Sequence, residues 1–391
     1  MKTFKGYQRA DGSVGIRNHI LIIAVDECAE GIARAISDKV ANSVVVTNYN
    51  TCMYGGNEEM ISTMINTACN PNVAGALVIA MGCGSIDPEI VAGPIRETGR
   101  MVDTLTCIKA KGTRSTISVG IEKASIIARE AEACERIDAP IEKLFVGIKC
   151  GGSDTSSGIA SNPSVGRAAD KLVDMGASAV AGELLELLGC EDILRNRAVT
   201  PEVADKIERL ISEEEKRWHV EGTEVETMSI GNSVGGLTTL EEKSLGALGK
   251  TGSRPIQDVL RINSRLTDTR HAPGMYLSEV TMLCGGAGMH FAALGCQVIL
   301  WTTGGAGFNN PIIPVIRVSG NHNLINDDID IDATGIMRGE DSIEAVSERI
   351  IEKLEGVVNG EQTAIEEIGY AYCTLYQKDQ RLEKMLCIEP A

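Results

Sequence analysis

The stretch His19-Ile20-Leu21-Ile22-Ile23-Ala24-Val25 decides the fold of this chain, because it is an unbroken apolar run of strand length. Such a run is typical of a strand that is buried on both faces of a parallel sheet. A helical pattern follows at residues 29–40. The same pairing recurs at 43–49 with 57–67 and at 75–81 with 87–98. Strands joined by helices in this order predict a parallel sheet that helices cover on both sides.

A second series of the same kind begins after residue 140. Its predicted strands and helices lie at 144–150, 165–175, 177–182, 201–220, 295–303, 312–318 and 342–355. The segment Ile137-Asp138-Ala139-Pro140 separates the two series, and a residue before proline is biased away from helix. The sequence therefore predicts an α/β protein of two Rossmann-like units with mostly parallel sheets covered by helices. The predicted domains are 1–140 and 141–391, and we expect the second to carry most of the active site.

Composition narrows the possible partners. The net charge of −17 argues against nucleic acid and against an anionic membrane surface. The 12 cysteines show no regular framework, and the chain has neither a secretory signal nor an apolar run long enough for a membrane helix. We therefore expect a cytoplasmic protein whose reduced thiols are available for metal binding. A small anionic substrate is still compatible with the charge if cations gather locally.

The run Lys149-Cys150-Gly151-Gly152-Ser153-Asp154 lies where a predicted strand ends. Ligands of open parallel sheets bind at the carboxyl ends of the strands, and glycines there expose N–H groups that suit an anion. The spacing is not that of a phosphate loop, so a carboxylate is the expected ligand. A glycine-rich turn with hydroxyl caps is the alternative interpretation. Because Gly182-Glu183 and Thr302-Thr303-Gly304-Gly305 are similar clusters, we expect one active site built from several loops.

Cysteines follow the first three predicted strands, at Cys28, Cys52 and Cys83. Such a set could build a metal or thiolate site, although a buried cysteine is by default a small apolar side chain. Cys83 and Cys150 are the favoured metal ligands because glycines lie next to both.

Glu241, Glu242 and Lys243 lie side by side where a glycine-rich turn becomes a predicted helix. Thr238 or Thr239 could cap this helix, and carboxylates in a first turn favour the positive end of the helix dipole. Helix capping and catalysis are both open as explanations of this charge cluster.

Four segments, at 6–18, 70–83, 149–163 and 235–246, together resemble the large catalytic region of the altronate and galactarate dehydratases. The resemblance runs over nearly the whole chain in the same order. Two phrases, Cys69-Asn70-Pro71-Asn72-Val73 and Ser153-Asp154-Thr155-Ser156-Ser157-Gly158, are also similar to a related branch, the large subunit of (2R)-sulfolactate sulfo-lyase. Membership of the family therefore leaves the substrate open.

The resemblance implies an iron-dependent lyase that removes water from a sugar acid and yields a 2-keto-3-deoxy acid. Removal of a proton next to a carboxylate requires a base and stabilisation of a dianionic enediolate. We expect Lys243, Glu242 or Glu241 to act as the base, and Fe²⁺, with Mn²⁺ as the alternative, to assist the leaving hydroxyl. The expected metal ligands are Cys83, Cys150, Asp154, Glu183 and Glu241. The expected substrate-binding residues are Lys149, Gly151, Gly152, Ser153, Asp154, Thr238, Thr239, Thr303 and Gly304.

The chain departs from the family pattern in ways that bear on substrate and partner. Full-length members carry a small N-terminal domain before the segment that begins here at Gly6, so we expect a separate small subunit and an oligomer. Gly84 stands after Cys83 where the dehydratases have glutamate, and the loop at 303–308 lacks their arginine. Both differences argue against altronate itself. Sulfo-lyase activity and a non-catalytic, sugar-acid-binding subunit are the alternatives.

Overall fold

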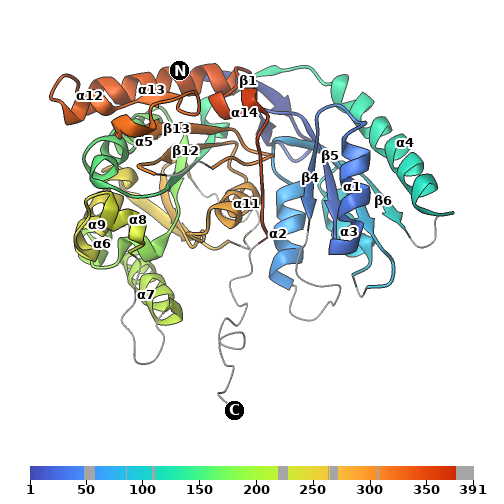
Figure 1. The fold of residues 1–391 in the computed structure, drawn as a ribbon, viewed down its shortest axis with the longest axis horizontal. Helices are drawn as coiled ribbons and strands as arrows, with labels where there is room; N and C mark the ends of the chain where they lie inside the picture. Colours follow the sequence, from blue (N-terminus) through green and yellow to red (C-terminus); the bar gives the residue numbers. More distant parts are fainter. Residues whose placement is uncertain are drawn as a thin grey trace, which may run out of the picture.

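The computed structural model describes residues 1–47, 58–84, 86–107, 111–218, 228–262, 264, 272–305 and 308–375. Figure 1 shows two lobes, with the early part of the chain in one and the later part in the other. Helix α13 (Ile343–Val358) runs along the top of the later lobe. No helix among the described residues combines the length and the apolar character that crossing a membrane requires.

The first lobe is built on a sheet of four parallel strands with β3 (His19–Ala24) inside it. Its strands lie in the order β4 (Ser43–Thr47), β3, β5 (Val73–Ala80) and β6 (Met101–Thr106). Every neighbouring pair in this sheet is parallel, as the apolar runs predict. The edge strand β6 was not predicted from the sequence, because it is half exposed and carries polar residues.

Successive residues of β3 face opposite layers of helices. Leu21 and Ile23 belong to the core on the side of α2 (Glu58–Ala68) and α3 (Pro88–Glu97). Ile20 and Ile22 belong to the core on the side of α1 (Glu30–Ser37) and α4 (Thr113–Glu132). Because side chains alternate along a strand, a run that is apolar throughout needs cover on both faces. The prediction of a parallel sheet covered by helices is confirmed.

The second lobe contains a sheet of seven strands, and all of its paired strands are parallel. Their order is β10 (Ile256–Leu260), β11 (Met275–Ser278), β9 (Ser178–Ala181), β8 (Phe145–Cys150), β12 (Val298–Thr302), β13 (Val315–Ser319) and β14 (Ile331–Asp332). The longer helices of this lobe are α5 (Asn162–Asp174), α7 (Pro201–Trp218), α9 (Leu240–Leu248), α11 (Cys284–Leu294) and α13. The shorter helical segments of the chain are η1 (Glu27–Ala29), η2 (Ile141–Lys143), η3 (Ser157–Ser161), η4 (Leu184–Leu187), α6 (Glu191–Arg195), α8 (Ile230–Val234), η5 (Gly249–Thr251), η6 (His322–Leu324), α12 (Thr334–Met337) and α14 (Ala364–Ile368).

A small antiparallel sheet lies beside these two and was not predicted. It consists of β2 (Val14–Gly15), β1 (Thr3–Gln8) and β7 (Ile137–Pro140), so the segment between the two series of strands returns to the start of the chain. Its strands have two, six and four residues, which leaves little periodicity for the sequence to show.

Two asparagines connect the lobes. The Nδ2 of Asn70 donates to the carbonyls of Ala292 and Cys296, at 2.8 and 2.9 Å. The Nδ2 of Asn72 donates to the carbonyls of Gln297 and Ile312, at 2.9 and 3.1 Å. One core cluster also draws on both lobes, since it joins Leu21 and Phe145. The segment Asn70-Pro71-Asn72 is therefore a structural link between the lobes. The division of the chain into two domains at residue 140 stays a prediction.

Candidate active site

Three neighbouring strands bring polar side chains together at the carboxyl-terminal ends of the strands of the large sheet. β8 lies between β9 and β12, and it ends in Lys149 and Cys150. Glu183 follows β9, and Thr302 ends β12. Parallel strands present their carboxyl ends at the same edge, which is where open α/β sheets bind ligands.

Cys150, Glu183 and Glu186 form a buried group of possible metal ligands at this edge. Their donor atoms all lie within 4.8 Å of one another, a spacing that a single metal ion could bridge. The Sγ of Cys150 lies 2.6 Å from Glu186 Oε2 and 3.7 Å from Glu183 Oε2. The Nζ of Lys250 contacts all three residues, at 2.8 Å from the Sγ, 2.8 Å from Glu183 Oε2 and 3.0 Å from Glu186 Oε2. We call these four residues the Cys150 cluster.

Two further buried lysines adjoin the Cys150 cluster. The Nζ of Lys149 forms an ion pair with Glu183 and donates to the carbonyls of Cys150 and Met282, at 3.0 and 3.2 Å. The Nζ of Lys243 lies 3.9 Å from Glu186 Oε1. Three ammonium groups and two carboxylates are thus gathered in one buried region.

The charges in this region depend on one another. Burial opposes ionisation of Glu186, but the ammonium groups of Lys250, Lys149 and Lys243 lower its pKa to about 2. Burial alone would lower the pKa of Lys250, whereas Cys150, Glu183 and Glu186 raise it well above its ordinary value. Burial, and after it Glu186, raises the pKa of the Cys150 thiol well above its ordinary value. These directions favour an ionised Lys250 beside a neutral Cys150 thiol.

Glu183 reaches the cluster through an unusual backbone conformation. Its φ of 72° and ψ of 63° lie in the left-handed region, which side-chain-bearing residues rarely adopt. Its N–H donates to the carbonyl of Val280 at 3.1 Å, and its Oε2 accepts from the N–H of Cys150 at 3.3 Å. Contacts on both sides thus hold the strained turn, and strain of this kind is concentrated at functional sites.

Glu186 and Lys250 were missed in the sequence analysis. Glu186 stands among leucines in the run 184–188, and Lys250 follows the glycine that ends α9. Each is a single charge in an otherwise uncharged stretch, and that isolation is the signal that could have drawn attention to them.

The predicted catalytic residues of α9 separate into two environments. Thr239 caps the helix by accepting from the N–H of Glu242 at 3.2 Å, and Glu242 Oε2 accepts from the N–H of Thr238 at 2.8 Å. Both threonines and both glutamates, Glu241 and Glu242, are exposed. Lys243 alone turns inward to the Cys150 cluster. The predicted cap is confirmed, while catalysis by the two glutamates stays a prediction.

Asp154 joins the glycine-rich loops into one junction. Its carboxylate accepts from Ser156 Oγ at 2.8 Å, from the N–H of Ser157 at 2.7 Å and from Asn321 Nδ2 at 3.0 Å. Asn321 Nδ2 also donates to the carbonyl of Gly304, at 2.7 Å. These contacts make Asp154 the structural centre of the loop junction, outside the group of possible metal ligands.

The other predicted site residues are placed as follows. Gly151, Gly152, Ser153 and Thr303 lie at the Asp154 junction, where the N–H of Gly304 donates to the carbonyl of Gly152 at 2.8 Å. Cys83 and Cys28 are exposed in the first lobe, and Cys52 lies outside the described residues. Of the predicted metal ligands, the structure gathers Cys150 and Glu183, and it places Cys83, Asp154 and Glu241 outside that group.

Substitution of Gly304 by alanine should disrupt the Asp154 junction. A Cβ there would overlap the Asp154 carboxylate, whereas a Cβ on Gly305 would meet nothing nearer than Gly152 Cα at 3.8 Å. We expect Gly304→Ala to lower the free energy of unfolding by about 1–3 kcal/mol. The matched Gly305→Ala should change it by less than about 0.5 kcal/mol. Urea unfolding measures both, and equal effects would contradict the assignment of Asp154 as the centre of the junction.

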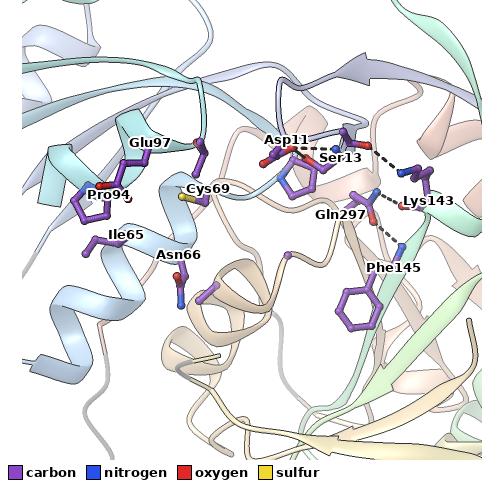
Figure 2. A pocket seen from close by; sticks show the side chains of 15 residues that line it. Asp11, Ser13, Ile65, Asn66, Cys69, Pro94, Glu97, Lys143, Phe145 and Gln297 are labelled. Atoms are coloured by element: carbon purple, nitrogen blue, oxygen red, sulfur yellow. Dashed lines mark hydrogen bonds between the residues drawn. The ribbon is translucent and has the colours of Figure 1, made fainter. Parts of the chain in front are cut away.

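A cavity of about 460 Å³ lies near the amino-terminal ends of the strands of the large sheet, opposite the candidate active site. Figure 2 shows Asn66, Cys69, Lys143 and Phe145 among its lining residues. Phe145 begins β8, whereas Lys149 and Cys150 end it, so the cavity is separate from the candidate active site. Gln297 closes one wall by donating to the carbonyl of Lys143 at 2.7 Å and accepting from the N–H of Phe145 at 2.6 Å.

Comparison with known families assigns the chain. Residues 141–380 match the family model described as D-galactarate/altronate dehydratase, C-terminal. Residues 6–132 match the model described as D-galactarate dehydratase/altronate hydrolase, second domain. The chain belongs to the D-galactarate/altronate dehydratase family. The candidate site thus lies in the region that the first of these models matches.

Characterised relatives of this family fall into two kinds. The (2R)-sulfolactate sulfo-lyase subunit beta of Chromohalobacter salexigens is 32% identical, over 94% of this chain and 96% of its own length. The altronate dehydratase of Bacillus subtilis is 31% identical, over 83% of this chain and 66% of its own length. The galactarate dehydratase (L-threo-forming) of Escherichia coli is 30% identical, over 92% of this chain and 73% of its own length. The family is therefore one of lyases, and its dehydratases are longer than the part that this chain matches.

Proposed function

We propose that this chain catalyses β-elimination on a small anionic hydroxy acid, namely the dehydration of a sugar acid to a 2-keto-3-deoxy acid. The observation that carries the proposal is the buried group of Lys149, Lys243 and Lys250 with two carboxylates at the strand ends. Fixed cations in a water-poor site are suited to stabilising the dianion that α-proton removal creates. The dehydratases among the relatives support this reaction class.

Lys243 is the base in this proposal. Its ammonium group adjoins Glu186 at 3.9 Å, so deprotonated Lys243 would lie beside the cluster that stabilises the product of proton removal. In the reaction, Lys243 first releases a proton to solvent. Its neutral amine then takes the α-proton, and hydroxide leaves the neighbouring carbon, which forms an enol. Tautomerisation of that enol gives the 2-keto-3-deoxy acid.

The substrate carboxylate is proposed to bind at the turn from Gly151 to Asp154, beside Lys149. The Nζ of Lys149 already donates to Glu183 and to two carbonyls, so it would exchange one of these acceptors for the substrate. Thr303 and Gly304 adjoin the same turn through the Asp154 junction. Thr238 and Thr239 lie exposed at the start of α9 and remain proposed contacts for the polyol part of the substrate.

The predicted Fe²⁺ or Mn²⁺ would supply a Lewis acid for the departing hydroxyl. Cys150, Glu183 and Glu186 are the one suitable group of three or more ligands that the described part of the chain contains. The ammonium group of Lys250 already contacts all three, so these residues do not fit a divalent ion in this arrangement. No step proposed here depends on a metal.

A sulfo-lyase is the second candidate. The observation in its favour is a relative named as a sulfo-lyase subunit beta, which is 32% identical over 94% of this chain. That reaction would begin with the same α-proton removal and expel sulfite in place of hydroxide. The word subunit in the relative's name also supports our proposal that this chain works with a separate small subunit in an oligomer.

The test is an assay of the chain, alone and together with the proposed small subunit, against altronate, galactarate and (2R)-sulfolactate. Formation of a 2-keto-3-deoxy acid from either sugar acid supports dehydration. Release of sulfite from sulfolactate alone would replace it with the sulfo-lyase reaction. Binding of sugar acids without turnover would indicate a non-catalytic subunit.

A further inference from the structure

Lys250 occupies the centre of the Cys150 cluster. Its Nζ lies at 2.8, 2.8 and 3.0 Å from the sulfur of Cys150 and the carboxylate oxygens of Glu183 and Glu186. The side chains of Lys250 and Glu183 have no exposed surface. An ammonium group has three N–H donors and no acceptor, so these three contacts satisfy it completely.

The three acceptors are the same atoms that make the cluster look like a metal site. A divalent ion bound by them would lie about 2.0–2.3 Å from each ligand atom. On the side of the three atoms that Lys250 approaches, that position overlaps the Nζ. Metal binding there therefore requires the lysine to leave a site in which all of its hydrogen bonds are made.

The charge of the buried region leads to the same conclusion. Lys149, Lys243 and Lys250 carry three positive charges, and Glu183 and Glu186 carry two negative charges. Even an ionised Cys150 would only bring the sum to zero. A divalent ion would add two positive charges to a buried site, and uncompensated buried charge is strongly unfavourable.

We propose that the ammonium group of Lys250 fills the metal position of the Cys150 cluster, so that this chain holds a lysine there in place of a divalent cation. Lys250 is then a positioning residue. It fixes Glu183, which pairs with Lys149, and Glu186, which adjoins Lys243. A metal that the lyase reaction uses would bind outside this cluster. The inference concerns the resting protein and does not depend on which substrate is eliminated.

Cobalt(II) titration of the full chain tests this proposal, because a thiolate bound to Co²⁺ gives a charge-transfer absorption band. The chain has 12 cysteines, so only a band that Cys150→Ser removes is assigned to the cluster. We expect no such band in the wild type. Lys250→Met removes the ammonium group and should create a Cys150-dependent band with an affinity for Co²⁺ at least about tenfold higher. Lys250→Met/Cys150→Ser should lose that band.

Lys206→Met is the matched control. Lys206 is ion-paired with Asp258 at 2.8 Å on the partly exposed helix α7, so its removal should leave the cobalt spectrum of the wild type unchanged. A Cys150-dependent band in the wild type overturns the proposal. A folded Lys250→Met protein, verified by circular dichroism, that gains no such band also overturns it.

If Lys250→Met does not fold, the comparison of the wild type with Cys150→Ser still decides. Identical cobalt spectra of those two proteins support the lysine-filled cluster, and a difference overturns it. Because the readout is metal binding without substrate, a negative result in the lyase assay does not affect it.

Discussion

Replacement of Lys243 by methionine is expected to lower kcat by about 10²–10⁴-fold, because the proposed base for the α-proton is lost. Methionine keeps the length of the side chain and its packing in the buried face of α9. The Nζ of Lys243 lies 3.9 Å from Glu186 Oε1. Circular dichroism of the variant verifies that it is folded, so that a loss of kcat is assigned to turnover and not to unfolding. Steady-state kinetics on the substrate found in the assay measures the effect.

Glu241→Gln and Glu242→Gln are the controls for this result. Both side chains are exposed, and glutamine can still accept the capping hydrogen bond that Glu242 takes from Thr238. We expect their kcat to stay within about threefold of the wild type, in line with the small effects of surface substitutions. Retention of turnover by Lys243→Met would refute the proposed base. If either glutamine variant lost as much kcat as we predict for Lys243→Met, the glutamate at that position would be assigned as the base.

Replacement of Glu183 by glutamine is expected to lower the free energy of unfolding by about 3–5 kcal/mol, because it removes a buried partner from two ammonium groups. Glu183 pairs with Lys149 through one oxygen and with Lys250 through the other, at 2.8 Å for the second pair. Glutamine has the same shape, but it carries no charge and would turn an NH₂ group toward one of the lysines. Urea unfolding at neutral pH measures the loss.

Glu213→Gln is the matched control for this substitution. Glu213 also pairs with a basic residue, Arg209 at 3.1 Å, but its side chain is 47% exposed. A surface pair of this kind contributes about 0.3–0.5 kcal/mol. If Glu183→Gln lowered the free energy of unfolding by no more than Glu213→Gln does, the Cys150 cluster would not be an ionised network.

The sequence predicted the elements whose apolar pattern is local. β3, β8 and their following helices were expected at nearly the observed positions, because burial on both faces leaves a continuous run of aliphatic residues. The rule that ligands bind at strand ends then indicated Lys149, Cys150 and Glu183 from their places along the chain. The strands β10 (Ile256–Leu260) and β11 (Met275–Ser278) escaped prediction. In β10 the polar residues Gln257 and Asp258 interrupt the apolar run.

The sequence by itself determined the α/β architecture and the edge of the sheet where the polar loops meet, because both follow from residues that are neighbours along the chain. Only the tertiary structure decided which charges share that edge. Lys250 meets Cys150 across 100 residues, and Glu183 reaches both through a left-handed turn that no sequence pattern indicates. Glu241 and Lys243 differ by two positions, yet one is exposed and the other buried, since residues two apart on a helix point to different faces.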